Sequence, residues 1–162
     1  MINIKDIYGN IIDFFYGIGY FGEYISFIFA IFLLYSQIFN MTFFIVIFIL
    51  NKIINDYLKD YFKQYRPSNP IKFLDDDKFS KKKYGMPSGH SQLSFFSLAY
   101  SYLSIKKITT SIILMFITCL LVVYERFVYH NHTINQLISG ALIGILIAYL
   151  SHILYTKLSI KL

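Results

Sequence analysis

The chain has 162 residues, of which 56% are hydrophobic, 20% aromatic and only 15% charged. A soluble domain of this length could not cover so much apolar surface, so the composition predicts an integral membrane protein. The net charge of +6 does not indicate nucleic-acid binding, because the basic residues gather at the ends of apolar segments, where lipid headgroups would lie.

The N-terminal half of the chain predicts one surface helix and two membrane spans. Residues 1–19 mix apolar and charged side chains, as in an amphipathic helix at the membrane interface. The first span is expected from about Tyr20 to Gln37, and the second from about Thr42 to Tyr65, with a tight turn at Asn40 to Thr42 between them. The second span should end there because Pro67 disfavours helix at the preceding residue.

The C-terminal half predicts a polar loop and three more spans. Residues 67–86 contain two prolines, three consecutive aspartates and several lysines, and should lie outside the bilayer. The third span is expected from Pro87 to about Ser104, the fourth over about 108–126 and the fifth over about 133–155. The single cysteine, Cys119, excludes an internal disulfide and argues against a metal cluster.

These elements predict an all-α fold, an integral membrane helical bundle with about five transmembrane helices. Residues 1–162 would form one domain, with spans one and two in 20–66 and spans three to five in 87–155. Because spans alternate in direction, the end of span two, the start of span three, the end of span four and the start of span five lie on one face. Those four ends hold nearly all the unusual polar residues.

The first polar cluster lies at the end of span two. Lys59, Lys63 and Arg66 are spaced i, i+4 and i+7, so on an α-helix they share one face and could hold a phosphate. The alternative is an interfacial helix end with snorkelling cations, paired with Asp56 and Asp60.

The second cluster, Pro87–Ser88–Gly89–His90, lies where span three begins. Proline suits the first turn of a helix, glycine lets an anion approach the backbone, and serine adds a hydroxyl donor. With His90 in the first turn, the cluster predicts an anion-binding site with an imidazole. The alternative is a plain helix cap with an incidental histidine.

The third cluster lies between spans four and five. Arg126 and His132 can converge if the chain breaks between the spans, and Gln136 follows His132 at i+4, within hydrogen-bonding reach. Gln136 could instead only cap the helix, because Thr133 and Gln136 match a capping box. We expect Glu125 to pair with a cation.

Three further residues or motifs should lie outside the chemistry. His130 is expected to be an interfacial histidine, and His152 lies near the opposite end of span five. Gly140 and Gly144 have the spacing that lets another helix approach closely.

The three clusters together resemble the three-part motif of the type-2 phosphatidate phosphatase superfamily, in order and at the right spacing over about Lys59 to Gly140. The resemblance implies a helical core and a phosphate site without a metal or other cofactor. The residues implied to bind phosphate are Lys59, Arg66, Ser88, Gly89 and Arg126. His132 would be the nucleophile that forms a phosphohistidine, and His90 the acid that protonates the leaving group.

Two positions depart from that superfamily's pattern. It usually has Asp where this chain has Gln136, and often Ser where this chain has Glu125. Gln136 and the segment Lys83–Gln92, KYGMPSGHSQ, are most similar to the dolichyl-diphosphate phosphatases, which act on the lumenal face of the endoplasmic reticulum and recycle the lipid carrier of N-glycosylation. By this resemblance, Gln136 of this chain would orient the nucleophile His132 without supplying charge.

The resemblance therefore implies a polyprenyl diphosphate substrate, membrane lipids as surroundings and no nucleic-acid partner. The alternatives are a phosphatase of the same superfamily that acts on phosphatidate, a phosphatidylglycerophosphate or undecaprenyl diphosphate, or an inactive lipid-binding homologue. The charge count disagrees with a lumenal site, because the candidate face carries more Lys and Arg than the opposite face.

Overall fold

The computed structural model describes residues 4–71 and 83–160, together with the side chains of residues 12–71 and 83–160. Residues 72–82 of the predicted polar loop lie outside the described residues. All regular elements of the described part are α-helices. They are α1 (Ile4–Tyr20), α2 (Gly22–Leu34), α3 (Ile38–Phe62), α4 (Gly89–Ile105), α5 (Thr110–Val128) and α6 (Ile134–Ser159). The all-α prediction is confirmed.

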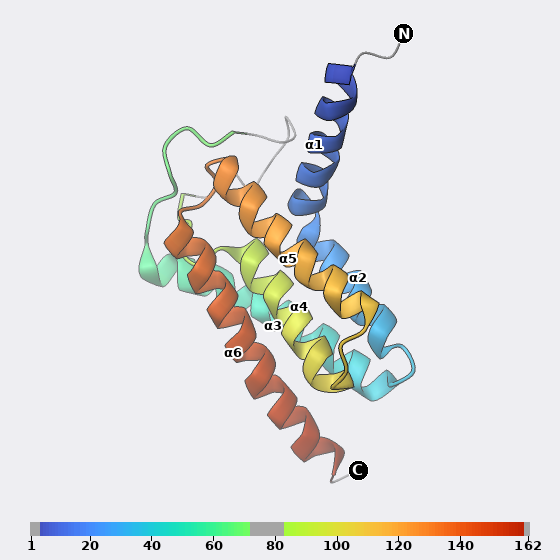
Figure 1. Cartoon of the computed structure of the whole chain (residues 1–162). Coiled ribbons are helices and arrows are strands. Elements are labelled where there is room, and N and C mark those ends of the chain that lie inside the picture. Colours follow the sequence, from blue (N-terminus) through green and yellow to red (C-terminus); the bar gives the residue numbers. More distant parts are fainter. Residues whose placement is uncertain (1–3, 72–82, 161–162) are drawn as a thin grey trace.

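Helix α4 lies at the centre of the bundle and packs against α2, α3, α5 and α6, while α1 packs against α5 (Figure 1). An aromatic core joins α3 to α4, with Phe44 stacked on Phe96 at a centroid distance of 5.5 Å. The hydroxyl of Tyr100 donates a 2.7 Å hydrogen bond to Asn40 of α3. This polar contact satisfies two buried groups inside an apolar core.

Among the described residues, three helices, α3, α5 and α6, are long and apolar enough to cross a membrane. Residues 12–20 of α1 and the whole of α2 qualify only as a joined pair, bent by 69°. Helix α4 has 17 residues and carries four buried serines, Ser91, Ser94, Ser97 and Ser101. The protein is therefore an integral membrane protein with three or four candidate spans, and the prediction of about five was only approximate.

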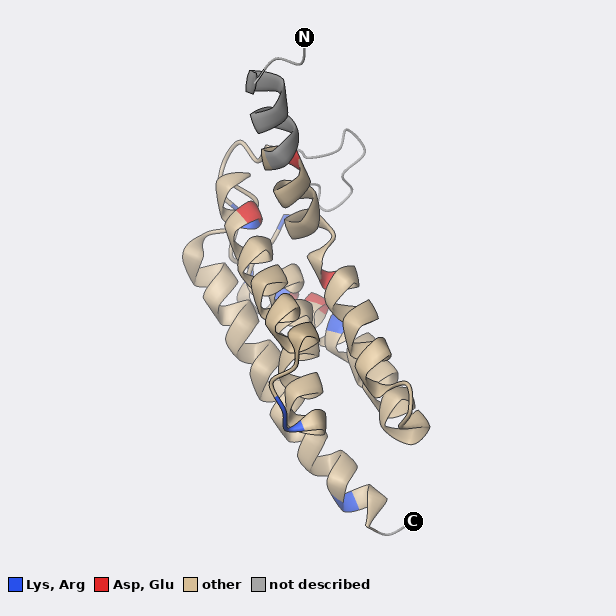
Figure 2. Cartoon of the chain, turned by 45° about the vertical axis from the view of Figure 1, so that its right-hand side comes forward, with Lys and Arg blue, Asp and Glu red and all other residues tan. Residues whose placement is uncertain are grey.

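The distribution of charge agrees with a membrane bundle. Figure 2 shows long uncharged stretches, with acidic residues only in the upper and middle parts of the view and basic residues alone at the lower end. Lys106 and Lys107 lie between α4 and α5, and Lys157 lies in the last turn of α6.

The first predicted span is shorter than expected. Helix α2 has 13 residues, or about 20 Å, against the roughly 30 Å of a hydrocarbon core. It reaches a spanning length only with residues 12–20, and all of these except Tyr20 belong to the predicted interfacial helix. That segment is helical as predicted, and its interfacial position stays a prediction.

The predicted turn at Asn40 to Thr42 is wrong. The chain turns at residues 35–37, and α3 begins at Ile38. Both polar side chains are satisfied within the helix start, because Thr42 donates to the carbonyl of Ile38 at 2.9 Å and Asn40 donates to Gln37 at 2.9 Å. Such local bonds let polar residues begin a helix rather than interrupt it.

The predicted close packing of α6 is confirmed. A Cβ atom added to Gly140 would collide with the carbonyl of Ser88, and one added to Gly144 would collide with the carbonyl of Gln92. The two glycines therefore let α6 lie directly against the N-terminal part of α4. This contact fixes the start of α4 relative to the start of α6.

Candidate active site

The helix ends that the sequence places on one face do converge. The N–H of Ser88, which precedes α4, donates to the carbonyl of Gln136 in α6 at 2.9 Å. Arg66, which follows α3, donates from Nη1 to the carbonyl of Asn131 between α5 and α6 at 3.3 Å. Hydrogen bonds to backbone carbonyls thus join segments that are far apart in the sequence.

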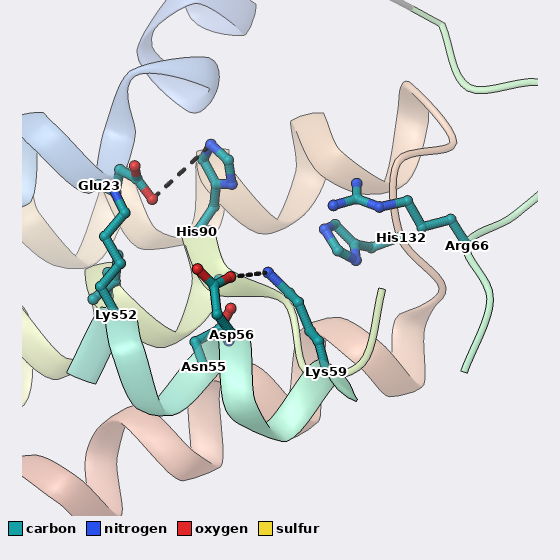
Figure 3. Close-up of a pocket in the computed structure, with 10 residues that line it drawn as sticks. Glu23, Lys52, Asn55, Asp56, Lys59, Arg66, His90 and His132 are labelled. Atoms are coloured by element: carbon teal, nitrogen blue, oxygen red, sulfur yellow. Dashed lines mark ion pairs between the residues drawn. The ribbon is translucent and has the colours of Figure 1, made fainter. Parts of the chain in front are cut away.

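One cavity opens where these ends meet (Figure 3). Five of the predicted site residues line it, namely Lys59, Arg66, Gly89, His90 and His132. The other lining residues are Glu23, Lys52, Asn55, Asp56 and Leu93. Ser88, Arg126 and Gln136 lie behind this lining, where each is fully buried.

The N-terminus of α4 forms one wall of the cavity. Ser88 is the N-cap and its hydroxyl accepts from the N–H of Ser91. Pro87 therefore precedes the cap, which corrects its expected place in the first turn. A Cβ on Gly89 would lie 2.9 Å from Oδ1 of Asn55 and 3.4 Å from Nζ of Lys59, so glycine keeps this space open. Free N–H groups at this helix start favour an anion.

Asn55 holds this wall against α3, and sequence reasoning missed it. Its Nδ2 donates to Oε1 of Gln92 at 2.8 Å and to the carbonyl of Pro87 at 3.3 Å. Gln92 in turn donates to Oδ1 of Asn51 at 2.6 Å. A buried amide network of this kind fixes two helices rigidly because every broken bond would leave a buried polar group. Its sequence signal is the spacing of Asn51 and Asn55, one helical turn apart in an apolar helix.

Two of the three cations expected on one helix face, Lys59 and Arg66, line the cavity, but they do not share a helix face. Lys59 is 8% exposed and its Nζ lies 3.8 Å from Oδ1 of Asp56. Lys63 ends α3 in the left-handed conformation, with φ of 49°, and does not line the cavity. Arg66 then reaches the cavity from the extended chain. The prediction that Lys59, Lys63 and Arg66 share one helix face is therefore wrong, because the helix ends at Phe62. Lys63 does not line the cavity with the other two residues.

Arg126 is fixed behind the cavity. It is fully buried, its Nε lies 2.7 Å from Oε2 of Glu125, and its guanidinium lies 4.8 Å from the ring centre of Tyr20. The expected pairing of Glu125 with a cation is confirmed. Nη2 of Arg126 has no hydrogen-bond partner in the described part of the chain. A buried donor of this kind favours an anionic ligand nearby.

Gln136 both caps α6 and orients His132. Its Nε2 donates to the carbonyl of Tyr65 at 2.8 Å and to Gln64 at 3.2 Å, so its Oε1 must face the other way. There Oε1 accepts from the N–H of Thr133 at 3.3 Å and lies 3.1 Å from Nδ1 of His132. The capping box and the predicted hydrogen-bond contact between Gln136 and His132 are therefore both present.

This arrangement decides the protonation of His132. Because Oε1 of Gln136 only accepts, Nδ1 of His132 carries the proton in the neutral ring, and the lone pair is on Nε2. Burial of the ring, together with the guanidinium of Arg66, lowers the pKa of His132 well below its ordinary value of 6.5. A neutral imidazole with an unprotonated Nε2 is a competent nucleophile.

The remaining histidines lie outside the cavity. His130 is exposed, with φ of 53°, in the turn between α5 and α6. His152 makes ring contacts with Tyr100 and Tyr155 toward the other end of α6. Neither lines the cavity, as the sequence predicted.

Glu23 and Lys52 were also missed by sequence reasoning. Both line the cavity, from α2 and α3. The available signal was a single carboxylate and a single amine, each set in an apolar stretch, which in a membrane chain points to function.

Cations, a helix N-terminus and two imidazoles around one cavity suit a phosphate ester, so fold and site together define a membrane phosphatase. Residues 40–160 match the PAP2 superfamily, and because this match covers well over half of the chain, the chain belongs to that superfamily. PAP2 phosphatases hydrolyse phosphate esters.

A solved structure shows the same fold. It is the crystal structure of a transmembrane PAP2-type phosphatidylglycerolphosphate phosphatase from Bacillus subtilis, with a TM-score of 0.69 and 17% sequence identity. The similarity covers 88% of this chain and 75% of the Bacillus chain. No curated protein matches the sequence.

Proposed function

We propose that this membrane phosphatase removes the terminal phosphate of a polyprenyl diphosphate, converting dolichyl diphosphate to dolichyl monophosphate through a phosphohistidine. The observation that carries the proposal is the neutral His132, held at Nδ1 by Gln136, in a cavity that also contains Lys59, Arg66 and His90. A nucleophile, an acid and anion-binding groups are thus present together.

In the first step, Nε2 of His132 attacks the terminal phosphorus, and the bond from phosphorus to the bridging oxygen breaks. His90 transfers its proton to that oxygen, so the lipid monophosphate leaves. In the second step, water attacks the phosphohistidine, His90 takes the proton from the water, and the phosphorus–nitrogen bond breaks. Inorganic phosphate leaves, and both imidazoles return to their starting states.

Lys59, Arg66 and the N–H groups at Gly89 would stabilise the phosphoryl oxygens, because charge that develops in the transition state needs donors already in place. Ser88 would contribute by capping α4. Arg126 would contribute from behind the cavity through Nη2, the donor that has no hydrogen-bond partner in the described residues.

The dolichyl assignment is supported by Gln136 and by the segment Lys83–Gln92. On this proposal the protein lies in the endoplasmic reticulum membrane with the cavity facing the lumen, where it would serve N-glycosylation. The lipid tail would stay in the bilayer while the phosphates reach the N-terminus of α4.

A second candidate is a phospholipid phosphatase, and the likeness to the Bacillus phosphatidylglycerolphosphate phosphatase favours it. Phosphatidate or undecaprenyl diphosphate would use the same residues. An inactive lipid-binding homologue is a third candidate, and the retained buried cations and imidazoles argue against it, since such groups are costly in a membrane.

The test is phosphate release by purified protein in detergent, without added metal, from dolichyl diphosphate, phosphatidate and phosphatidylglycerophosphate side by side. The proposal predicts the highest kcat/KM with dolichyl diphosphate, and loss of release with His132→Ala. Preference for either phospholipid would keep the site and overturn the dolichyl assignment. Release that survives His132→Ala would overturn the nucleophile.

A further inference from the structure

Glu23 has no role in the reaction described above, although its carboxylate lies in the same cavity. It occupies the first turn of α2, just after the bend that joins α1 to α2, and is 3% exposed. A buried carboxylate in a membrane protein is costly unless a partner compensates for its lost hydration. A nearby group should therefore explain its presence.

The nearest imidazole is that of His90. Oε2 of Glu23 lies 4.0 Å from Nε2 of His90, and both side chains are buried. Figure 3 shows the ring of His90 between Glu23 on one side and His132 with Arg66 on the other. Glu23 therefore approaches the ring from the side away from the nucleophile.

We propose that Glu23 is a positioning residue that keeps His90 protonated and correctly oriented to donate a proton to the leaving group. This inference rests on the proposed function, because it assigns a partner to the acid of that reaction. In this role Glu23 acts through the ring of His90 and not on the phosphate directly.

The charges around His90 explain why such a partner is needed. Cations near an imidazole oppose its protonation, and a carboxylate close to it favours the protonated form. The charged and titratable groups around His90 are Glu23 from α2, Lys52, Asp56 and Lys59 from α3, Arg126 from α5, and Arg66 and His132 from the chain between helices. Asp56 pairs with Lys59 at 3.8 Å, whereas Glu23 is the carboxylate that lies beside the ring of His90.

The two imidazoles of the cavity thus have opposite neighbours that match opposite tasks. His132 contacts a neutral amide oxygen, that of Gln136, and must be unprotonated to attack phosphorus. His90 lies beside a carboxylate and must be protonated to act as an acid. Environments that separate two titratable groups in this way are typical of acid–base assignments in enzymes.

The test uses Glu23→Gln in the full chain, with Ser26→Ala as the matched control. Ser26 is buried on the same helix, three residues further on, and does not line the cavity. The dependence of kcat on pH is measured with dolichyl diphosphate and with phosphatidate. The two substrates differ in leaving group, since a lipid monophosphate departs with less help from a proton than an alkoxide does.

We expect Glu23→Gln to lower kcat for phosphatidate by about 100-fold and kcat for dolichyl diphosphate by a clearly smaller factor. The alkaline limb of the kcat profile, where the acid loses its proton, should move to lower pH by about one unit. Ser26→Ala should keep both kcat values within about twofold. If Glu23→Gln does not fold, Glu23→Asp is measured in its place. This variant keeps the negative charge, so the alkaline limb of its kcat profile should not move. Its loss of kcat should again be larger for phosphatidate than for dolichyl diphosphate.

Equal losses on both substrates with an unmoved alkaline limb would show that Glu23 only supports packing, and would overturn the inference. If wild type hydrolyses only one of the substrates, the pH profile on that substrate decides. Failure of the proposed function would look different. Either the wild-type protein would release phosphate from neither lipid, or the His132→Ala variant would still release it.

Discussion

Nδ1 of His132 lies 3.1 Å from Oε1 of Gln136, and this contact determines which ring nitrogen is available for attack. The orientation of the amide is itself fixed, because its Nε2 donates to the carbonyl of Tyr65 and to Gln64. The neutral glutamine therefore favours the protonated form of His132 only through this hydrogen bond and adds no negative charge.

Changing Gln136 to Glu tests this relationship. The added carboxylate should raise the pKa of His132, because an opposite charge within hydrogen-bonding reach favours imidazolium. The acid limb of kcat/KM, where the nucleophile becomes protonated, should therefore move to higher pH. An acid limb that does not move would mean that residue 136 has no influence on the nucleophile.

The wild-type pH dependence follows from burial of His132. Its folded-state pKa lies well below 6.5, so the ring is neutral in the native protein at pH 7 and is protonated only in stronger acid. Below about pH 6.5 the unfolded chain binds the proton and the native chain does not, so this histidine lowers stability as the pH falls.

Activity should accordingly persist below pH 6.5. Arg66→Gln removes the cation that helps to lower the pKa of His132, so its acid limb should lie closer to pH 6.5 than that of wild type. The measurement is kcat/KM against pH for both proteins. A wild-type acid limb at or above 6.5 would contradict the account.

Lys59 and Lys63 form a matched pair of lysines. Lys59 lines the cavity, whereas Lys63 caps α3 outside it. Lys59→Ala should lower kcat/KM by at least about 100-fold, since a buried cation that meets phosphate contributes several kcal/mol to transition-state binding. Lys63→Ala should remain within about twofold of wild type. Similar losses of kcat/KM in both variants would contradict this difference and would indicate that Lys59 and Lys63 act together on one helix face.

Gly144 tests the packing that positions α4. Alanine normally stabilises a helix relative to glycine by about 1 kcal/mol. Here the added Cβ would meet the carbonyl of Gln92, so Gly144→Ala should instead lower stability by about 1–3 kcal/mol. Leu142→Ala, at a position that is 61% exposed, is the control. Thermal unfolding in detergent compares them, and a raised Tm for Gly144→Ala would contradict the packing.

Much of this arrangement could be predicted from the sequence. The long apolar stretches predict the helices of the C-terminal half to within a few residues, because a bilayer demands helices of a minimum length. The alternation of spans then places the ends of α3, α4, α5 and α6 on one face. Five of the predicted residues line the cavity for that reason.

The parts that could not be predicted depend on contacts between distant segments. The start of α3 was misplaced because Asn40 and Thr42 resemble turn residues, although Tyr100, sixty residues later, satisfies Asn40. Lys63 was placed on a helix face because spacing alone does not show where a left-handed residue ends the helix. Glu23 lies outside the three motifs and reaches the cavity only through the packing of α2 against α4.

The central claim is that His132 forms a covalent phosphoenzyme. The most direct test is to mix the purified protein with dolichyl diphosphate labelled in its terminal phosphate, quench within milliseconds in base, and measure label on the protein. Phosphohistidine survives base and is lost in acid. The account predicts a base-stable, acid-labile phosphoenzyme in wild type and none in His132→Ala, which should still fold. Turnover without such an intermediate, or label that persists in His132→Ala, would contradict it.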